Sequence, residues 1–200
     1  MTVEEIFTAL EGKFDVKREA LDKWGVTAVV AAPYLHNAVQ FLKEESGIKI
    51  DMLVDIAGID YLTYPNHEGP RFAVSYAFKS MKNPGARIRL KVLVSEESLK
   101  VPTISDLYAN ANWYEREVFD QFGVIFEGHP DLRRLLNHVE FVGHPLRKDY
   151  PAQKRQWLST NDYLLPQLEQ RLEELGYKVV QRSKEVETND NEFLEGSIKA

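Results

Sequence analysis

The chain has 200 residues, of which 44% are apolar, and this supports one domain with a real core, or one domain with an appended arm. It contains no cysteine, which excludes disulfides, thiolate zinc sites and cysteine-ligated iron–sulfur clusters from this chain. A formal net charge of −6 argues against broad nucleic-acid binding, because such binding needs a positive surface that faces the phosphates.

The first fifty residues predict compact α/β structure. Apolar residues at positions 3, 6, 7 and 10 follow helical spacing and predict a helix that starts at Thr2 and ends at Gly12. Residues 26–32 (VTAVVAA) predict a buried strand, and Pro33 opens a helix over the residues that follow. Polar residues interrupt the long uncharged run over 24–42, so we expect membrane association only through a partner.

The middle of the chain predicts a sheet. Residues 51–64 read as a strand with a bend at Gly58, and residues 71–78 and 86–94 alternate apolar and polar side chains as strands do. Short turns rich in Pro, Gly and Asn separate these strands, which favours antiparallel neighbours. The predicted fold class is therefore α+β, with an antiparallel or mixed sheet that helices cover on one face, followed by an extended C-terminal arm.

A further helix and an arm are predicted after the sheet. Thr103 or Ser105 can start helical turns that lead to Trp113, and apolar residues at 107, 114, 118 and 122 fall at helical spacing. Gly123 is a candidate left-handed C-cap. A short extended segment follows over 124–126. We expect an α+β domain over 1–126, an extended partner-wrapping arm over 127–160, and a helix with an acidic tail over 161–200. Pro166 is tolerable there only in the first turn of the helix.

Acid/base chemistry is not supported by the charged helix. Glu115 and Glu117 are two residues apart, so their side chains point about 200° apart on a helix and cannot flank one bond. Arg116 and Asp120 are four apart and are expected to pair on one face. Glu115 and Glu117 would then meet basic groups of the arm or of a partner.

Metal and nucleotide sites are not supported either. His129, His138 and His144, with Asp131, have no compact ligand spacing, and capping or hydrogen-bonding roles fit His129 and His144 better. The glycine pair at 123 and 128 has histidine where a phosphate loop needs lysine, and no GxGxxG occurs. The sequence predicts no catalytic, metal-binding or cofactor-binding residue.

Two basic pairs point to an interface. Arg133–Arg134 and Arg147–Lys148 lie beside leucine, phenylalanine and tyrosine residues in a segment with too few apolar residues to fold alone. Arginine and aromatic side chains are enriched at protein interfaces. We therefore expect an α+β domain that pins an extended arm onto a larger protein. Replacing both Arg133 and Arg134 with alanine is expected to weaken assembly and leave the isolated domain folded.

Two stretches carry a family resemblance. The run EREVFDQFGVIFEGHPDLRRLL over 115–136 and the run GHPLRKDYP over 143–151 closely resemble the signature of the thirty-kilodalton subunit of respiratory complex I, which in bacteria is the C subunit of NADH-quinone oxidoreductase. Residues 51–61 (DMLVDIAGIDY) also resemble this family, and the resemblance extends over about residues 26–151.

The resemblance implies a role in a complex. Members carry no cofactor or catalytic residue; they lie in the peripheral arm, on the cytoplasmic side of the bacterial inner membrane. They wrap the forty-nine-kilodalton (D) subunit, which helps to form the quinone site, and contact neighbouring peripheral-arm subunits. The whole complex uses FMN, iron–sulfur clusters, NADH and quinone in proton translocation. The signature positions, with expected roles in fixing the arm and docking the partner, are Glu115, Arg116, Glu117, Asp120, Gly123, His129, Pro130, Asp131, Arg133, Arg134, Gly143, His144, Pro145, Leu146, Arg147, Lys148 and Asp149.

Three alternatives stay open. The same signature is expected in the equivalent subunit of a membrane-bound hydrogenase or of a complex with another electron donor. A stand-alone acid/base or metal-dependent enzyme would use Glu115, Glu117, His129 and Asp131. An assembly factor would leave the mature complex. The resemblance does not cover residues 161–200, which we expect to form an additional contact surface.

Overall fold

The structure, a computed structural model, describes residues 3–22, 25–45, 47, 49–83, 85–154, 156 and 159–177. The chain divides into two compact units, Met1–Tyr150 and Pro151–Ala200. Residues 127–150, which the sequence assigns to the arm, belong to the first unit. The acidic tail over 178–200 lies outside the described residues.

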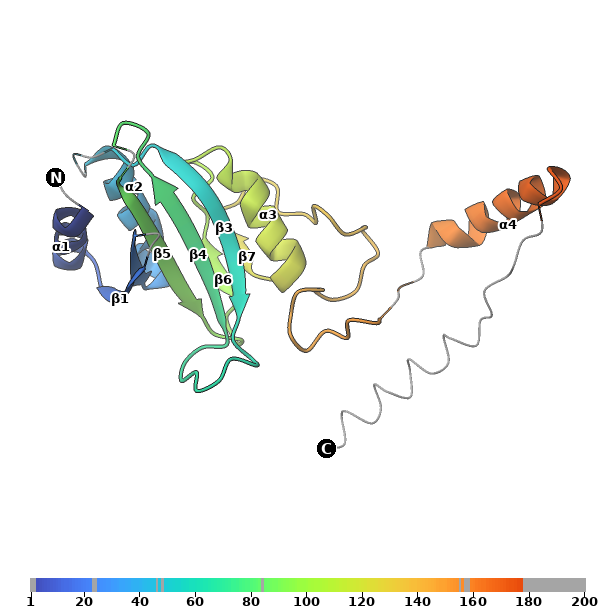
Figure 1. Cartoon of the computed structure of the whole chain (residues 1–200), viewed down its shortest axis with the longest axis horizontal. Helices are drawn as coiled ribbons and strands as arrows, with labels where there is room; N and C mark the ends of the chain where they lie inside the picture. The colour runs from blue at the N-terminus through green and yellow to red at the C-terminus, as the bar shows by residue number, and fades with distance from the viewer. Residues whose placement is uncertain are drawn as a thin grey trace. The chain divides into compact units, whose positions relative to one another are not determined.

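The first unit is built on a mixed five-stranded sheet of order β1-β2-β5-β4-β3 (Figure 1). Its strands are β1 (Val16–Asp22), β2 (Gly25–Val30), β3 (Met52–Asp60), β4 (Phe72–Lys79) and β5 (Arg87–Val94). The consecutive strands β3, β4 and β5 pair antiparallel, as their short turns predict, whereas β2 runs parallel to β5. The sheet is thus mixed, within the predicted fold class. The strand β1 was not predicted, because four of its seven residues are charged.

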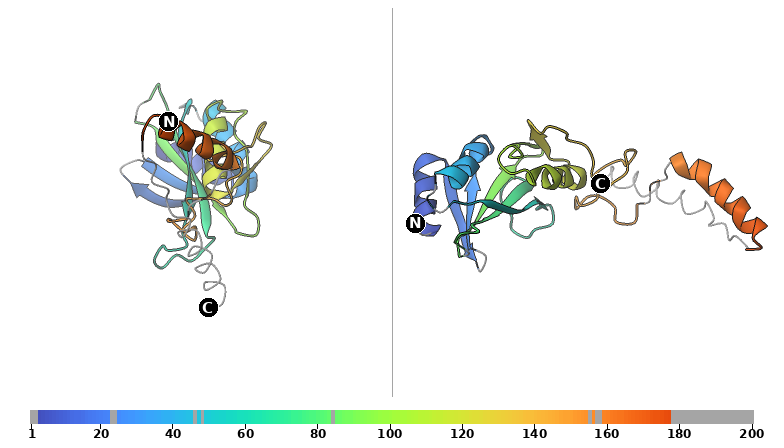
Figure 2. Two further views of the ribbon diagram at one scale, coloured as in Figure 1. Left: turned by 90° about the vertical axis from the view of Figure 1, so that its right-hand side faces the viewer. Right: turned by 90° about the horizontal axis from the view of Figure 1, so that it is seen from above.

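Helices cover one face of this sheet. They are α1 (Val3–Lys13), the short 3-10 turn η1 (Ala32–Tyr34), α2 (Leu35–Glu44) and α3 (Ala111–Phe122) (Figures 1 and 2). Apolar residues from α1 and α2 meet the inward side chains of the strands, among them Val74, Tyr76 and Phe78, in one core. The other face carries polar side chains such as Ser75 and Lys91, which are less buried. The prediction of helices on one face is confirmed.

The segment before α3 forms turns, as the sequence predicts. These turns lie within residues 103–110, and the helix begins at Ala111. The Glu115 carboxylate accepts a hydrogen bond from the backbone N–H of Ile104 at 2.8 Å and so connects this segment with α3. The short strands β6 (Lys100–Pro102) and β7 (Ile125–Glu127) pair parallel before and after α3. The predicted C-cap is confirmed, since Gly123 has φ of 80°.

Gly58 has a role other than the predicted bend. It pairs regularly with Val74, and the irregularity of β3 lies between Leu53 and Asp55. A Cβ atom added at Gly58 would lie 2.4 Å from the Phe122 ring. Glycine is therefore required there because α3 packs directly on the strand.

We expect Gly58→Ala to lower the free energy of unfolding by about 1–3 kcal/mol, since the added methyl group overpacks the contact with Phe122. Urea denaturation of the purified chain measures this. Gly12→Ala is the matched control, because a Cβ atom added at Gly12 would have nothing within 4 Å. An alanine inside a helix should stabilise by about 0.5–1 kcal/mol relative to glycine. Equal effects at the two sites would contradict the packing role of Gly58.

The second unit contains α4 (Ser159–Glu174). Its start at Ser159 places Pro166 inside the helix and beyond the first turn, so the condition that the sequence set for this proline is not met. Several of its apolar side chains are exposed, including Tyr163, Leu164 and Leu168. In the part of the chain that the structure describes, no helix is both long enough and apolar enough to cross a membrane.

Candidate functional site

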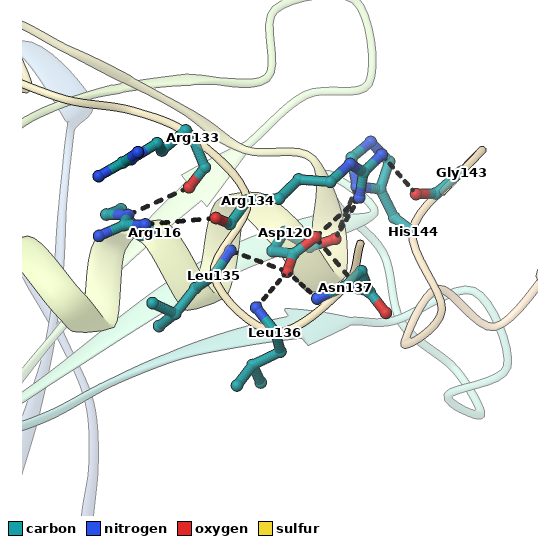
Figure 3. A network of polar contacts seen from close by, with 9 residues as sticks. All are labelled: Arg116, Asp120, Arg133, Arg134, Leu135, Leu136, Asn137, Gly143 and His144. Carbon is teal, nitrogen blue, oxygen red and sulfur yellow. Dashed lines mark hydrogen bonds and ion pairs between the residues drawn. The ribbon is translucent and has the colours of Figure 1, made fainter. Parts of the chain in front are cut away.

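The site is centred on Asp120, a side chain of α3 with no exposed surface. Its Oδ2 accepts hydrogen bonds from three successive backbone N–H groups, those of Leu135, Leu136 and Asn137, at 3.1, 2.8 and 2.8 Å (Figure 3). Its Oδ1 accepts from Arg134 Nη1 at 2.7 Å and from the Asn137 amide at 3.0 Å. Burial alone would raise the pKa of Asp120, but these bonds outweigh it and lower the pKa to about 2. The ionised carboxylate thus pins residues 134–137 against α3.

Arg116 holds the preceding residues of the same segment. Its Nε donates to the carbonyl oxygen of Arg133 at 3.1 Å, and its Nη2 donates to that of Arg134 at 3.3 Å (Figure 3). Asp120 pairs with Arg134, so the predicted pairing of Arg116 with Asp120 is replaced by contacts to the returning chain. This charged network therefore joins α3 to residues 133–137 and does not run along the helix alone.

The second signature block caps the C-terminal end of α3. His144 Nδ1 donates to the carbonyl oxygen of Asp120 at 3.0 Å, and Arg147 Nε donates to that of Phe122 at 2.7 Å. The backbone N–H of Leu146 donates to the carbonyl of Gln121. These carbonyls lack partners within the helix, and positive charge is favourable at this end. Burial lowers the pKa of His144, and the nearby arginines lower it further. The predicted hydrogen-bonding role of His144 is confirmed.

A second buried carboxylate fixes the end of this block to the sheet. Asp60, at the end of β3, accepts two bonds of 2.9 Å from the Arg71 guanidinium and one of 2.8 Å from the backbone N–H of Lys148. Arg71 also pairs with Asp149 at 2.9 Å and with Glu96 at 2.7 Å. Burial would raise the pKa of Asp60, but the bonds, chiefly from Arg71, lower it to about 2. Residues 133–149 are thereby held at both ends.

Glu115 and Glu117 differ in environment, as the helix geometry predicts. Glu115 is fully buried and bonds to Thr103 and to the backbone of Ile104, whereas Glu117 is exposed. His129 Nδ1 accepts from the N–H of Asp131 at 3.0 Å, and its Nε2 lies 3.2 Å from the carbonyl oxygen of Asn112. Within the described ranges, no three His, Asp or Glu side chains are placed to hold a metal ion.

An exposed surface lies beside the pinned segment. We define the docking face by Trp113, Glu117, Arg133 and Leu136. Trp113 and Glu117 are four residues apart on α3 and share one side of the helix, next to the side on which Arg116 and Asp120 hold residues 133–137. The exposed fraction is 58% for Trp113 and 64% for Leu136. Tryptophan and arginine are the residues that most often dominate binding energy at interfaces.

Most of the predicted docking residues fall into two groups, and Gly123, Gly143 and Pro145 belong to neither. Those with side chains turned toward the chain's own backbone or buried carboxylates are Arg116, Asp120, Arg134, His144 and Arg147, with Glu115 and His129. Those that are exposed are Glu117, Pro130, Asp131, Arg133, Leu146, Lys148 and Asp149. Gly123 and Gly143 have positive φ, and Pro145 is half-buried.

The sequence did not single out Asp60, Arg71 and Asn137. Asp60 lies in the family-like run over 51–61, which was the one signal available for it. Arg71 lies at the strand start after a turn cluster, and Asn137 follows the basic pair. Their roles depend on contacts between segments far apart in the chain, such as the bond between Asp60 and Lys148.

The regions of this chain that match known proteins include this site. Residues 28–156 match the family described as "Respiratory-chain NADH dehydrogenase, 30 Kd subunit". Two curated proteins, each named as the C subunit of NADH-quinone oxidoreductase, from Burkholderia mallei (strain SAVP1) and Burkholderia pseudomallei (strain K96243), are 45% identical over 127 residues. The match covers 62% of this chain and 62% of the length of each of those relatives.

Solved structures share the fold. The trypsin-resistant fragment (1-134) of Nqo5, in a P63 form, is 36% identical with a TM-score of 0.58, and the match covers 66% of this chain and 100% of the fragment. A chain of the membrane-bound sulfane sulfur reductase, an archaeal respiratory membrane complex, is 22% identical with a TM-score of 0.60 over 90% of this chain and 94% of that one. At that identity the likeness shows the fold alone. The family match includes α3 and both pinned blocks.

Proposed function

Because the chain belongs to the family of the respiratory-chain NADH dehydrogenase 30 kDa subunit, we propose that it is a non-catalytic subunit of a proton-translocating NADH:quinone oxidoreductase. Its role is to present residues 127–150 and the docking face to a neighbouring subunit. The observation that carries this proposal is the inward anchoring of the signature polar groups by Asp120 and Asp60, with apolar side chains left outside. A preformed surface binds with a smaller loss of conformational entropy than a flexible one.

The proposed partner is the forty-nine-kilodalton (D) subunit, with other peripheral-arm subunits beside it. FMN, the iron–sulfur clusters, NADH and quinone would be held by other subunits, since this chain has no cysteine and no predicted cofactor site. The proposed location is the cytoplasmic side of the bacterial inner membrane, with attachment through the complex. Family membership and the anchored arm support these statements.

The docking face gives a direct test. We expect the double variant Trp113→Ala with Leu136→Ala to lose binding by about 30- to 1,000-fold, because two exposed anchors of an interface are each worth about 1–2 kcal/mol. The measurement is titration of the tagged chain onto membranes from a host strain that lacks its own copy. Met81→Ala is the control, since Met81 is 60% exposed in the turn between β4 and β5. Equal binding by the double variant and the control would show that the docking face is not part of the interface.

The structure revises the expectation for the basic pair. Arg134 neutralises buried Asp120, so the double alanine variant of Arg133 and Arg134 is expected to release the arm segment as well as weaken assembly. Arg133→Ala alone is the cleaner probe of partner contact, because the Arg133 side chain is 73% exposed and pairs only with exposed Asp131 among the described residues.

A further inference from the structure

Glu115 is a buried carboxyl group that lacks a close cation among the described residues. Its side chain has no exposed surface. One oxygen, Oε1, accepts from the N–H of Ile104 at 2.8 Å, and the other, Oε2, lies 2.5 Å from the Thr103 hydroxyl. Across the described chain, the sole basic group within 4 Å of it is Nε2 of His129, at 3.9 Å. A buried carboxylate without a charged partner is costly, which favours the protonated form.

Both ring nitrogens of His129 face backbone groups. Its Nδ1 accepts the N–H of Asp131 at 3.0 Å, so the ring hydrogen of the neutral form is on Nε2, which faces the carbonyl oxygen of Asn112 at 3.2 Å. A second proton on Nδ1 would set two N–H groups against each other. Neither ring nitrogen of His129 thus forms a hydrogen bond with Glu115, whose Oε2 lies 3.9 Å from Nε2.

Two hydroxyl groups connect Glu115 with the surface. The Thr103 hydroxyl has one hydrogen and lies between Glu115 Oε2 and Ser105 Oγ, which is 2.9 Å away. With Glu115 protonated, Glu115 donates to Thr103 and Thr103 donates to Ser105. With Glu115 ionised, both donations reverse. Thr103 and Ser105 line an open hollow of about 510 Å³ together with His36 and Asp106, so protons can reach the cluster from solvent.

Tyr76 contributes a second buried polar group. Its hydroxyl, on β4, has no hydrogen-bond partner among the described residues and no exposed surface. Burial raises the pKa of Tyr76, and the charge of nearby Glu115 raises it further. An ionised Glu115 thus lies near a neutral phenol, the His129 ring and, toward the hollow, the carboxylate of Asp106, which is paired with His36.

We propose that Glu115, enclosed by Thr103, Tyr76 and His129, is a buried proton-binding site, and that loss of its proton loosens residues 129–131 from α3. The His129 side chain has no exposed surface and covers one side of the carboxyl group. An ionised Glu115 gains hydration when His129 moves away, whereas a protonated one gains little. Proton binding at Glu115 and attachment of the arm are therefore linked.

The pH range follows from the environment. Burial raises the pKa of Glu115 from 4.5 to about 7, although the bonds from Ile104 and Thr103 partly offset it. Since the folded-state pKa is the higher one, the contribution of this proton to stability is complete below the unfolded-state value of 4.5. It is lost as pH rises through about 7. Asp60 and Asp120 titrate near pH 2 and do not contribute in this range.

Hydrogen exchange of the full-length chain tests the linkage. Glu115→Gln is the matched variant, because its amide keeps the shape and both bonds of the protonated carboxyl group at every pH. The quantity compared is the equilibrium constant for local opening of the peptide that contains residues 127–131, taken as the ratio of wild type to variant. This ratio is expected to rise up to tenfold per pH unit between about pH 5 and 7 and then to level off. An unchanged ratio across this range would overturn the proposal.

A pH titration of Glu115 in the unmutated chain tests the proposal without the glutamine variant, and so does not depend on whether that variant folds. The carboxyl carbon of Glu115, followed by NMR with ¹³C-labelled glutamate, is expected to titrate well above 4.5, near neutral pH. Tyr76→Phe removes the unpaired hydroxyl and should leave this titration in place. A Glu115 carboxyl that titrates near its ordinary value would show that no buried proton site exists.

Discussion

Asp120→Ala is expected to lower the free energy of unfolding by about 3–5 kcal/mol, the range found when one partner of a buried ion pair is removed. The change leaves the Arg134 guanidinium, which is 20% exposed, without its anion, and leaves the N–H groups of Leu135, Leu136 and Asn137 without an acceptor. Chemical denaturation of the purified chain measures the loss, and proteolysis should detect a released arm as faster cleavage within residues 133–143.

The control for this variant is Asp131→Ala. Asp131 is an acid of the same segment, but it is 55% exposed and pairs with exposed Arg133. Such surface pairs contribute about 0–1 kcal/mol. If the two alanine variants lowered the free energy of unfolding equally, the hydrogen bonds and ion pair of Asp120 would not be what anchors the arm.

The same carboxylate predicts an acid transition. The pKa of Asp120 is lowered from 3.8 to about 2, so its contribution to stability is present above pH 3.8 and is lost as pH falls toward 2. A shift of this size corresponds to about 2 kcal/mol at neutral pH. The Asp120→Ala variant should show a correspondingly smaller loss of stability over this pH range than the wild type.

Arg71→Met is expected to have an effect of similar size, about 3–5 kcal/mol, because Asp60 is fully buried and would keep its charge without its counterion. The ion pairs of Arg71 with Asp149 and Glu96 would be lost as well, and the end of the arm would be held by fewer contacts. Denaturation measures stability, and hydrogen exchange at residues 147–149 measures local release.

A double-mutant cycle isolates the pair. Asp60→Asn removes the charge and keeps most of the shape, so the combined variant with Arg71→Met should be more stable than Arg71→Met alone. Strict additivity of the two single changes would mean that the contact between Asp60 and Arg71 contributes nothing of its own.

The sequence predicted elements that local pattern determines. The apolar spacing of residues 114, 118 and 122 and the glycine at 123 were enough for the body and end of α3, and alternation was enough for β4 and β5. The bond that the Ile104 N–H donates to the Glu115 carboxylate was not predictable in this way, because it joins residues 11 apart in sequence.

The sequence indicated most of the residues that belong to the candidate site. It did not indicate which of them form hydrogen bonds or ion pairs with one another. A rule for neighbours four apart on a helix predicted a pairing of Arg116 with Asp120. The returning chain offers Asp120 three N–H groups and Arg134 instead, and these contacts are 14 to 17 residues away in sequence. Likewise no local pattern indicates that Asp60 reaches Lys148, 88 residues later. Some of the charged residues that were expected to meet a partner therefore hold the arm instead.

The proposed place of this chain in an NADH:quinone oxidoreductase can be tested by purifying the complex through a tag on this chain. Mild-detergent extraction from the native host, mass spectrometry and assays with NADH and with other electron donors should be combined. We predict a large membrane complex that contains this chain in equal stoichiometry with its other subunits and reduces quinone with NADH. Recovery of the chain alone under conditions that preserve such complexes, or of a complex that accepts only another donor, would contradict it.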